Sequence, residues 1–425
     1  MEFFDIRDVR TESLTILLEN GSVEKPKFER FHGKGFRVFK NGWGYYSGLV
    51  DDSEGIKLAE RNIIRADTEG IDATSFSGKY EFMQKENVDD VSVEEKIQLL
   101  REIEKELKDS FIVNTRVGYI ENKRRFHYRN SSGEEVEYFV PRVGVSIQAV
   151  AKDGSLQFLS KRLFRVGGFE VLTDEVFEMA IELREKLKDL VNALPPPSGR
   201  MPVLMDPSLG GVFIHEAFGH AVEADHLLKG ASILKKTGIR VGPEELYVYD
   251  DPLMPEFGFF PYDDEGYKAE KKTIIESGVF KEFLHSRETA YRMNGRAGNA
   301  RSQGVMEPIV RMSNTYIAEG SYSLDELLEE VKNGVYLIGS RGGETNPATG
   351  YFQFNAQYGY LIVNGEIRNM VRDVSLSGNT LEILKGIKIG KGVKFDSGFC
   401  GKSGQLVPVS DGAPPTVVTA LVGGS

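Results

Sequence analysis

Gly-Gly-Val-Phe-Ile-His-Glu-Ala-Phe-Gly-His-Ala-Val-Glu-Ala-Asp occupies residues 210–225. The stretch places His215, Glu216 and His220 inside an otherwise apolar run. Neutral imidazoles can hold a divalent metal ion, and a neighbouring carboxylate can accept a proton from a water that the ion activates. The stretch therefore predicts a metal-binding helix, with zinc as the expected ion and hydrolysis as the expected chemistry.

The spacing of the two histidines is unusual for a metal helix. In the common zinc-protease pattern the histidines are four residues apart, whereas His215 and His220 are five apart. On a regular α-helix this spacing separates the side chains by about 140°, too far for one ion. We therefore expect a π-bulge or a break near Phe218-Gly219, because glycine eases an irregular turn. The alternative is two buried structural histidines that hydrogen-bond to backbone carbonyls.

A catalytic zinc site usually needs a third protein ligand. Residues that carry suitable atoms are His226, His285, Glu223, Asp225 and Cys400. The cysteine lies in a glycine-rich run, Ser397 to Gln405, where the backbone can approach another group closely. The neighbouring Lys402 would favour the thiolate form. A single cysteine is nevertheless often a small core residue, so the residues alone leave the third ligand open.

Composition excludes several classes of protein. The chain has 425 residues, of which 40% are hydrophobic and 28% charged, as expected for a globular protein of two or three domains. Its formal net charge is −11, which disfavours direct binding of nucleic acid or of an anionic membrane. No run approaches 20 uninterrupted apolar residues, and the first residues do not resemble a signal peptide. With only one cysteine, the chain is expected in the cytoplasm.

The first part of the chain is predicted to mix strands and helices. Asn41-Gly42 indicates a hairpin, because both residues tolerate positive φ. Ser92 and Glu95 form a capping-box pattern at the start of a helix, and Thr173 is the expected cap of a later one. The predicted helices are 55–67, 92–108 and 174–193. The predicted strands are 14–19, 35–39, 45–50, 111–120, 124–129, 135–140, 143–151 and 156–164.

The second part is predicted to be mostly β. Three prolines in Leu194–Gly199 stop both helix and sheet, so we place the domain boundary there. After it, 202–205 is a short strand, Ser323 caps a helix over 325–332, and turns at 276–278 and at Asn364-Gly365 indicate hairpins. The predicted class is α+β, with an N-terminal α/β domain (1–195) and a C-terminal, mostly antiparallel β domain (196–425). The second domain is expected to be a barrel or sandwich that carries the metal-motif helix.

Several segments together resemble one known family. His-Glu-Ala-Phe-Gly-His (215–220), followed late in the chain by Gly-Phe-Cys-Gly-Lys-Ser-Gly-Gln (398–405), resembles the TldD/PmbA family of metallopeptidase-like proteins, in its TldD-like branch. Four further segments look like the same family. They are 294–299, 311–316, 349–354 and 376–379. The likeness spans both halves and is most specific from about Pro202 onward.

The resemblance implies a ligand set and an assembly. Carried over by position, it implies His215, His220 and Cys400 as zinc ligands and Glu216 as the catalytic carboxylate. It also implies an N-terminal α/β domain, a C-terminal β domain, and a dimer whose interface encloses a peptide cavity. The partner subunit would be a second copy or a PmbA-like (TldE) chain, and no direct contact with nucleic acid or membrane is expected.

The candidate substrate contacts lie in segments that are rich in arginine or in aromatic residues. Arg296 and Arg311 are candidates for holding a peptide carboxylate or polarising its carbonyl, with surface or interdomain salt bridges as the alternative. Phe352 and Phe354 lie in a run that could pair with an extended peptide, with a core strand as the alternative. The predicted function is a zinc peptidase acting on unfolded peptides. Its rival is a peptide-binding or regulatory subunit with a structural metal, in a family whose members have been described as modulators of DNA gyrase.

Overall fold

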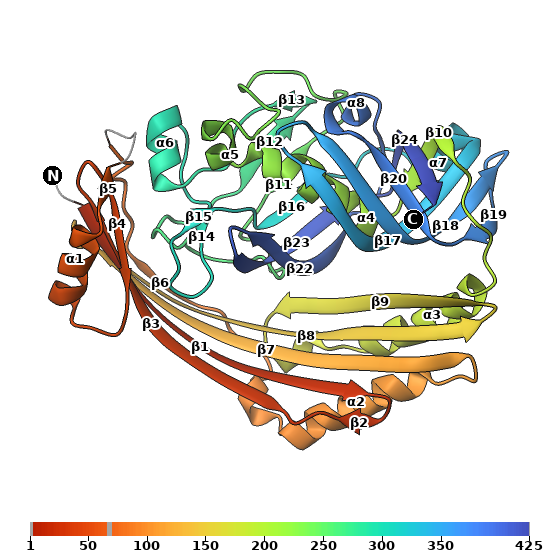
Figure 1. Cartoon of the computed structure of the whole chain (residues 1–425), viewed down its shortest axis with the longest axis horizontal. Helices are drawn as coiled ribbons and strands as arrows, with labels where there is room; N and C mark the ends of the chain where they lie inside the picture. Colours follow the sequence, from red (N-terminus) through yellow and green to blue (C-terminus); the bar gives the residue numbers. More distant parts are fainter. Residues whose placement is uncertain (1–2, 66–69, 425) are drawn as a thin grey trace.

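The computed structural model describes residues 3–65 and 70–424, and it has two β-rich halves joined through the proline run. The first half is built on one long, curved sheet that lies beneath the second half in Figure 1. Its strands are β1 (Phe3–Glu19), β2 (Ser22–Val23), β3 (Lys27–Phe39), β4 (Gly42–Ser47), β5 (Ile64–Arg65), β6 (Gly78–Glu81), β7 (Ile112–Asn130), β8 (Glu135–Asp153) and β9 (Ser155–Val166). Its helices are α1 (Asp52–Arg61), α2 (Val93–Leu107) and α3 (Glu175–Leu190).

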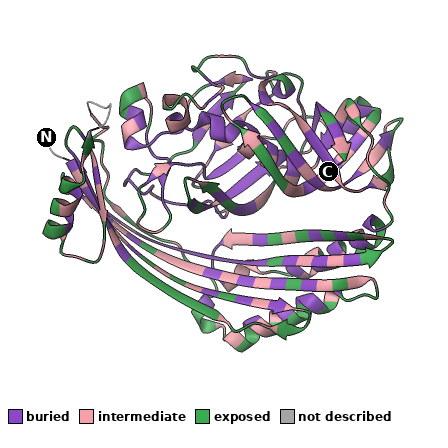
Figure 2. Ribbon diagram, viewed as in Figure 1, coloured by how far each residue is buried: buried purple, intermediate pink, exposed green. Residues whose placement is uncertain are grey.

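Buried and more exposed residues alternate along the long strands (Figure 2), and the strands bury opposite faces at their two ends. Near one end, Val117 and Val145 pack with the apolar stripes of α2 and α3. Toward the other end, Phe126 and Tyr138 lie on the opposite face and pack against Phe259 of the second half. Successive strand residues point to opposite faces of the sheet. The buried residues switch between odd-numbered and even-numbered positions along β7 and along β8, so the core moves from one face to the other. One sheet thereby supports both a helical layer and the second half.

Most local signals in the first half are confirmed. Asn41-Gly42 joins β3 to β4 with Asn41 at positive φ, and the Ser92–Glu95 capping box starts α2. The helix expected over 55–67 is α1, which ends at Arg61, and residues 66 and 67 lie outside the described part of the chain. The helix expected over 174–193 is α3. Its N-cap residue is Asp174 instead of Thr173, although the Thr173 hydroxyl accepts a hydrogen bond from Glu175 N at 3.4 Å.

The expectation of four short strands between 111 and 151 is wrong. The structure has two strands of 19 residues each, β7 and β8, paired along their length. The gaps that were expected between the short strands contain buried polar residues, and the partners of these residues lie in other parts of the chain. Glu121 pairs with Lys96 of α2 at 2.8 Å, and Arg142 donates to the carbonyls of Phe257 and Phe259 in the second half. Both strands therefore continue through polar positions that the sequence pattern alone could not distinguish from loops.

The second half contains a closed five-stranded barrel and a separate six-stranded sheet. The barrel ring runs β10–β17–β18–β20–β24 and closes because β24 also pairs with β10. The other sheet has the order β13–β12–β11–β16–β23–β22. The strands are β10 (Gly199–Met205), β11 (Val248–Asp250), β12 (Lys272–Glu276), β13 (Val279–Phe280), β14 (Ala300–Arg301), β15 (Ile309–Val310), β16 (Asn314–Ile317), β17 (Asn333–Asn346), β18 (Tyr351–Val363), β19 (Glu366–Val371), β20 (Val374–Asn379), β21 (Lys388–Ile389), β22 (Lys394–Lys402), β23 (Gln405–Ala413) and β24 (Thr416–Gly424).

Short helices connect these strands, and the metal-motif stretch is one of them. The helices are α4 (Pro207–Val212), α5 (Ala224–Leu228), α6 (Arg287–Met293), α7 (Leu324–Val331) and α8 (Thr380–Leu384). The N-cap at Ser323 and the hairpins at 276–278 and Asn364-Gly365 are confirmed, and Glu326 completes a capping box with Ser323. α4 packs against β17 of the barrel and β23 of the other sheet, so the stretch that follows α4 lies between the two. The predicted α+β class, with a β-rich second half that carries this helix, is confirmed, and the barrel alternative is the correct one.

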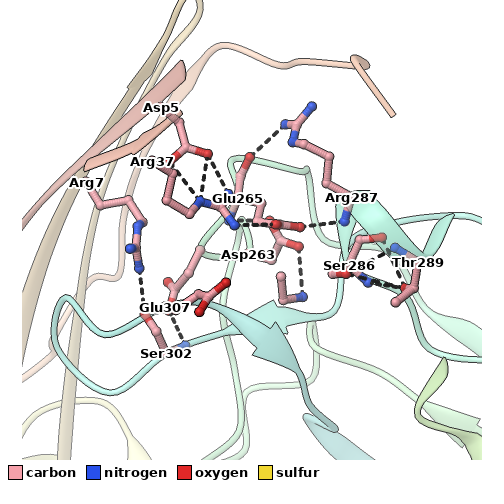
Figure 3. Close-up of polar contacts among 12 residues, drawn as sticks. Asp5, Arg7, Arg37, Asp263, Glu265, Ser286, Arg287, Thr289, Ser302 and Glu307 are labelled. Carbon is pink, nitrogen blue, oxygen red and sulfur yellow. Dashed lines mark hydrogen bonds and ion pairs between the residues drawn. The ribbon is translucent and has the colours of Figure 1, made fainter. Parts of the chain in front are cut away.

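A buried group of charges fastens the first sheet to the second half (Figure 3). We call it the joint cluster; it consists of Asp5, Arg7, Arg37, Asp263, Glu265 and Arg287. Arg37 of β3 pairs with Asp5 of β1 at 2.5 Å and with Glu265 at 2.8 Å. Glu265 in turn accepts the backbone N–H of Arg287 at 2.6 Å. Arg37 thus has carboxylate partners, whereas the guanidinium of Arg287 donates to backbone carbonyls, among them that of Glu265.

None of the helices within 3–65 and 70–424 has the length and apolar character needed to cross a membrane.

Candidate metal centre

His215 and His220 lie on a helical segment that departs from α geometry where the sequence predicts it. Asp206 caps α4 by accepting a hydrogen bond from Leu209 N at 2.9 Å. A π-helical turn over Phe213–Phe218 follows, and then a 3₁₀ turn over Gly219–Val222. The wider turn adds the fifth residue to the spacing and brings the two imidazole ring centroids to 5.3 Å. The predicted irregularity near Phe218-Gly219 is confirmed.

Gly219 is needed there for close packing. Its φ of −58° is ordinary for any residue, so conformational freedom is not the reason for a glycine. A Cβ at this position would lie 2.1 Å from Sδ of Met312. The Ala217 carbonyl, at the end of the π turn, lies 3.0 Å from the buried hydroxyl of Thr380, which can donate to it. Neighbouring segments thus hold the irregular turn in place.

Cys400 reaches the two histidines from β22. Its Sγ lies 3.5 Å from His220 Nε2. One ligand atom each from His215, His220 and Cys400 lie within 4.8 Å of one another, and all three residues are buried. Burial raises the pKa of the Cys400 thiol, but the charge of His215 and hydrogen bonds from both histidines more than offset it and lower that pKa to about 6. The thiol is therefore poised to act as a thiolate ligand.

A carboxylate stands behind each imidazole. Asp411 Oδ1 lies 2.6 Å from His215 Nδ1, although off the line of an ideal hydrogen bond. Glu223 Oε2 lies 2.9 Å from His220 Nδ1. Because each carboxylate contacts Nδ1, the Nε2 atom of each ring is left to face Cys400. Both histidines hydrogen-bond with Cys400. Such outer carboxylates fix the tautomer and orientation of metal-binding histidines. No role was predicted for Asp411, which lies far along the chain in a Ser-Asp-Gly segment without a recognisable motif.

Lys402 keeps the buried Glu223 side chain ionised. Burial raises the pKa of Glu223, while Lys402 and His220 oppose that effect, and the net result is a pKa of about 2. The ammonium of Lys402 lies 3.0 Å from Glu223 and 2.8 Å from Asp225. Glu223 is therefore ionised at neutral pH, as an acceptor for the His220 N–H must be.

Glu216 lies beside the three converging atoms without joining them. Its Oε2 is 3.6 Å from His220 Nε2, and its side chain is 39% exposed. It projects from the π turn next to His215, as expected for adjacent helical residues. A carboxylate that is close to the ligand atoms and open to solvent can exchange a proton with a water at the site.

Two of the other candidates for the third ligand, His226 and His285, lie apart from the three converging atoms, and Glu223 contacts His220 on the far side of its ring. The ring of His226 is 6.3 Å from that of His220 and belongs to a second group with Glu223 and Asp225. His285 hydrogen-bonds to Thr289 at 3.1 Å instead. Of the five candidates that the residues left open, the structure brings Cys400 to the two histidines.

Three of the four residues expected to contact substrate, Arg311, Phe352 and Phe354, are buried. Arg311 is fully buried and donates to the backbone carbonyls of Gln405 and Cys400, so it supports the cysteine strand. Phe352 and Phe354 lie in the core of the second half, where Phe352 packs on Phe213. Their strand, β18, is paired on both sides over this segment and cannot accept a further strand there. Arg296 forms surface ion pairs with Glu282 and Glu270, and a role for it in substrate binding stays a prediction.

The whole chain matches known family models and relatives. Models of the PmbA/TldA metallopeptidase match as domain 1 over residues 4–66, as central domain over 86–191 and as C-terminal domain over 198–424. A metalloprotease of Archaeoglobus fulgidus is 60% identical over the full length of both chains. A metalloprotease of Methanocaldococcus jannaschii is 40% identical over 97% of this chain and 94% of its own. A zinc metalloprotease TldD homologue of Saccharolobus solfataricus is 38% identical over 70% of this chain and 69% of its own.

Solved structures show the same fold. A proposed modulator of DNA gyrase from Thermotoga maritima superposes with a TM-score of 0.83 at 26% identity, covering 99% of this chain and 96% of its own. TldE from Thermococcus kodakarensis shares the fold with a TM-score of 0.77 at 20% identity, covering 99% of this chain and 97% of its own. Together with the family models and the convergent histidines and cysteine, these likenesses show that the chain belongs to the PmbA/TldA metallopeptidase family.

Proposed function

We propose that this chain is a zinc-dependent peptidase in which His215, His220 and Cys400 hold the metal and Glu216 is the general base. One observation carries the proposal. Two imidazole nitrogens and a thiol sulfur converge from helix and strand, with a solvent-accessible carboxylate directly beside them. A purely structural zinc site would not need a carboxylate at that position.

The donor set and its spacing support zinc. Two imidazoles and a thiolate are ligands that zinc accepts readily, and three protein ligands are typical of its catalytic sites. Zinc–nitrogen and zinc–sulfur bonds in a tetrahedral site place the two ligand atoms about 3.6 Å apart. The separation of Cys400 Sγ and His220 Nε2, 3.5 Å, agrees with that value.

The residues of the chain divide the chemistry among them. Bound zinc would supply a Lewis acid that lowers the pKa of a water and polarises a peptide carbonyl. Glu216 accepts the proton of the attacking water and later returns it to the leaving amine. Asp411 and Glu223 hold the imidazole rings in the orientation that this geometry requires. The Arg311 guanidinium, bonded to the Cys400 carbonyl, fixes the strand that carries the thiolate.

The position of Cys400 favours an extended, unfolded peptide as substrate. β22 is the last strand of its sheet, and β9 of the first half contacts it near Ser397, so the part of its edge proposed for a peptide is the Cys400 end. Phe399 and Leu406, which flank the Cys400 end of the hairpin, are 46% and 53% exposed. An extended peptide could pair with this edge by strand addition. We further propose that the chain works as a homodimer or with a PmbA-like (TldE) subunit, since TldE shares its fold.

The test compares the purified chain with Glu216→Gln. We expect about one zinc per chain in both proteins, by elemental analysis. We expect chelator-sensitive cleavage of an unfolded peptide by the wild type, and a loss of rate of about 10²–10⁴-fold in the variant. Glu94→Gln, an exposed glutamate in the first turn of α2, is the matched control. Full cleavage by Glu216→Gln would remove that residue from catalysis. Zinc binding without cleavage, alone or with a TldE-like chain, would favour a regulatory subunit.

A further inference from the structure

Lys402 lies two residues after Cys400 and points toward the metal-motif helix. Its side chain is 7% exposed. Its Nζ lies 3.0 Å from Glu223 Oε2, 2.8 Å from Asp225 Oδ1 and 3.0 Å from the Val310 carbonyl oxygen. An ammonium group has three N–H donors, and here each has an acceptor. The lysine is therefore fully engaged and has no donor left for a substrate carboxylate.

Glu223 passes the effect of this lysine to a metal ligand. The side chain of Glu223 is fully buried, and its Oε2 contacts both Lys402 and His220 Nδ1. Lys402, Glu223 and His220 thus form one continuous line of contacts. The line begins on the strand that carries Cys400 and ends at a ring on the helix, so it connects two of the ligands through side chains.

We propose that Lys402 is a positioning residue for the metal centre: it holds the Glu223 carboxylate against His220 and thereby fixes the ring in its metal-binding orientation. Without its ammonium, the carboxylates of Glu223 and Asp225 would face each other unneutralised in a buried setting, which is costly. Glu223 would then turn away, and the His220 ring would lose its acceptor. The inference rests on the proposed ligand set.

The direction in which metal affinity changes when the Lys402 charge is removed distinguishes a positioning role from electrostatic repulsion of the metal. A positive charge near a metal ion repels it, so if repulsion were the main effect of Lys402, removing the charge would tighten metal binding. If Lys402 acts through Glu223 on His220, removing it must weaken metal binding. Loss of an outer partner of a histidine ligand typically weakens metal affinity about 10–100-fold.

The experiment measures binding of Co²⁺ to the full-length chain by competition with a chelator. Absorption by the thiolate–cobalt bond reports whether Cys400 is a ligand. Lys402→Met, nearly equal in length but uncharged, should bind Co²⁺ about 10–100-fold more weakly than the wild type. Lys394→Met, at the exposed start of the same strand, should leave the affinity unchanged. Equal or tighter binding by Lys402→Met would overturn the proposal.

A second variant covers a failure of Lys402→Met to fold. Lys402→Ala leaves space for a small cation, and ethylammonium in the buffer should restore the Co²⁺ affinity while uncharged ethanol should not. Absence of any effect of ethylammonium on a folded Lys402→Ala protein also contradicts the proposal. If the wild type itself binds no Co²⁺ through a thiolate, the proposed ligand set fails and the role of Lys402 fails with it. If the wild type binds and Lys402→Met matches it, only the role of Lys402 is wrong.

Discussion

The joint cluster and the metal centre are both groups of buried charged and polar side chains, yet they are assembled on different rules. In the joint cluster opposite charges are in direct contact, as in the ion pairs of Arg37 with Asp5 and Glu265. In the metal centre the atoms that face one another, two ring nitrogens and a sulfur, are all electron-pair donors. The carboxylates there stand behind the rings, at Asp411 and Glu223.

This difference separates a structural role from a ligand-binding one. Opposite charges in contact satisfy one another, so removing one member leaves its partners buried and unpaired. Electron-pair donors that converge on one point are typical of a metal site. Substitutions in the joint cluster should therefore change stability and leave metal binding alone, whereas substitutions in the metal centre should do the reverse.

The largest effect on stability is expected for Arg37→Met. The substitution leaves Asp5 and Glu265 buried without their cation, which costs about 3–5 kcal/mol in free energy of unfolding. Urea unfolding measures the loss. Arg30→Met, an exposed arginine of the same strand, should change stability by less than about 0.5 kcal/mol. The zinc content of folded Arg37→Met should equal that of the wild type. A fall in zinc content would show that the joint cluster also affects metal binding.

Cys400→Ser should have the converse effect. The serine hydroxyl stays protonated where the cysteine gives a thiolate, so zinc affinity should fall by at least about a hundredfold, the upper range for an outer partner. The unfolding free energy of the metal-free chain should stay within about 1 kcal/mol of wild type. His226→Gln is the control, since its ring belongs to the second group, and it should keep zinc. If Cys400→Ser kept its zinc affinity and His226→Gln lost it, His226 would replace Cys400 as the third ligand.

Gly219→Ala should affect both properties, because it acts on the turn that shapes the site. Its Cβ would lie 2.1 Å from Met312 Sδ, and such overpacking costs about 1–3 kcal/mol. Displacement of the turn should also weaken zinc binding. In the double variant with Met312→Ala, the two costs should be less than additive, which thermal unfolding can show. Gly386→Ala, where a Cβ meets nothing within 4 Å, is the matched control.

The smallest effect concerns His285, a buried histidine that bonds a hydroxyl where His215 and His220 each have a carboxylate. Burial, and next the charge of Lys272, lower its pKa to about 4. In the unfolded chain its pKa is about 6.5, so the unfolded state takes up the proton first as pH falls. The contribution of His285 to stability is thus complete above pH 6.5 and is lost as pH falls toward 4.

Between pH 7 and pH 6 this loss amounts to about 0.7 kcal/mol. His285→Gln should lack this component, so the difference in unfolding free energy between wild type and variant should shrink by that amount over the same interval. A constant difference would show that the pKa of His285 is not lowered in the folded protein.

Local signals predicted the local structure, and long-range contacts limited the rest. The capping boxes at Ser92 and Ser323 and the hairpin at Asn41-Gly42 involve residues within four positions of one another, so the sequence shows them complete. The continuity of β7 and β8 depends on partners for Glu121 and Arg142 that come from a helix and from the second half. No periodicity within a strand can indicate such partners.

The metal centre divides in the same way. The five-residue spacing of His215 and His220 implied the irregular turn by geometry alone, and the structure has it. Cys400 came from the family resemblance, since the residues by themselves left five candidates. Asp411, and Lys402 as the partner of Glu223, could not be assigned, because only the fold brings them to the helix. Arg311, Phe352 and Phe354 have the residue types of binding sites, but the fold uses them inside the protein.

The closed barrel has a consequence for the order in which the protein becomes active during synthesis. Its ring begins with β10 and is completed by β24, which ends at Gly424. The helix with both histidines follows β10 directly, whereas Cys400 and Asp411 emerge from the ribosome almost two hundred residues later. A nascent chain therefore carries the histidines through roughly two fifths of its elongation without the thiolate or the closed ring. Any hydrolytic capacity of this centre has to await the last strand, so an unfinished chain cannot cleave itself or its neighbours on the same message.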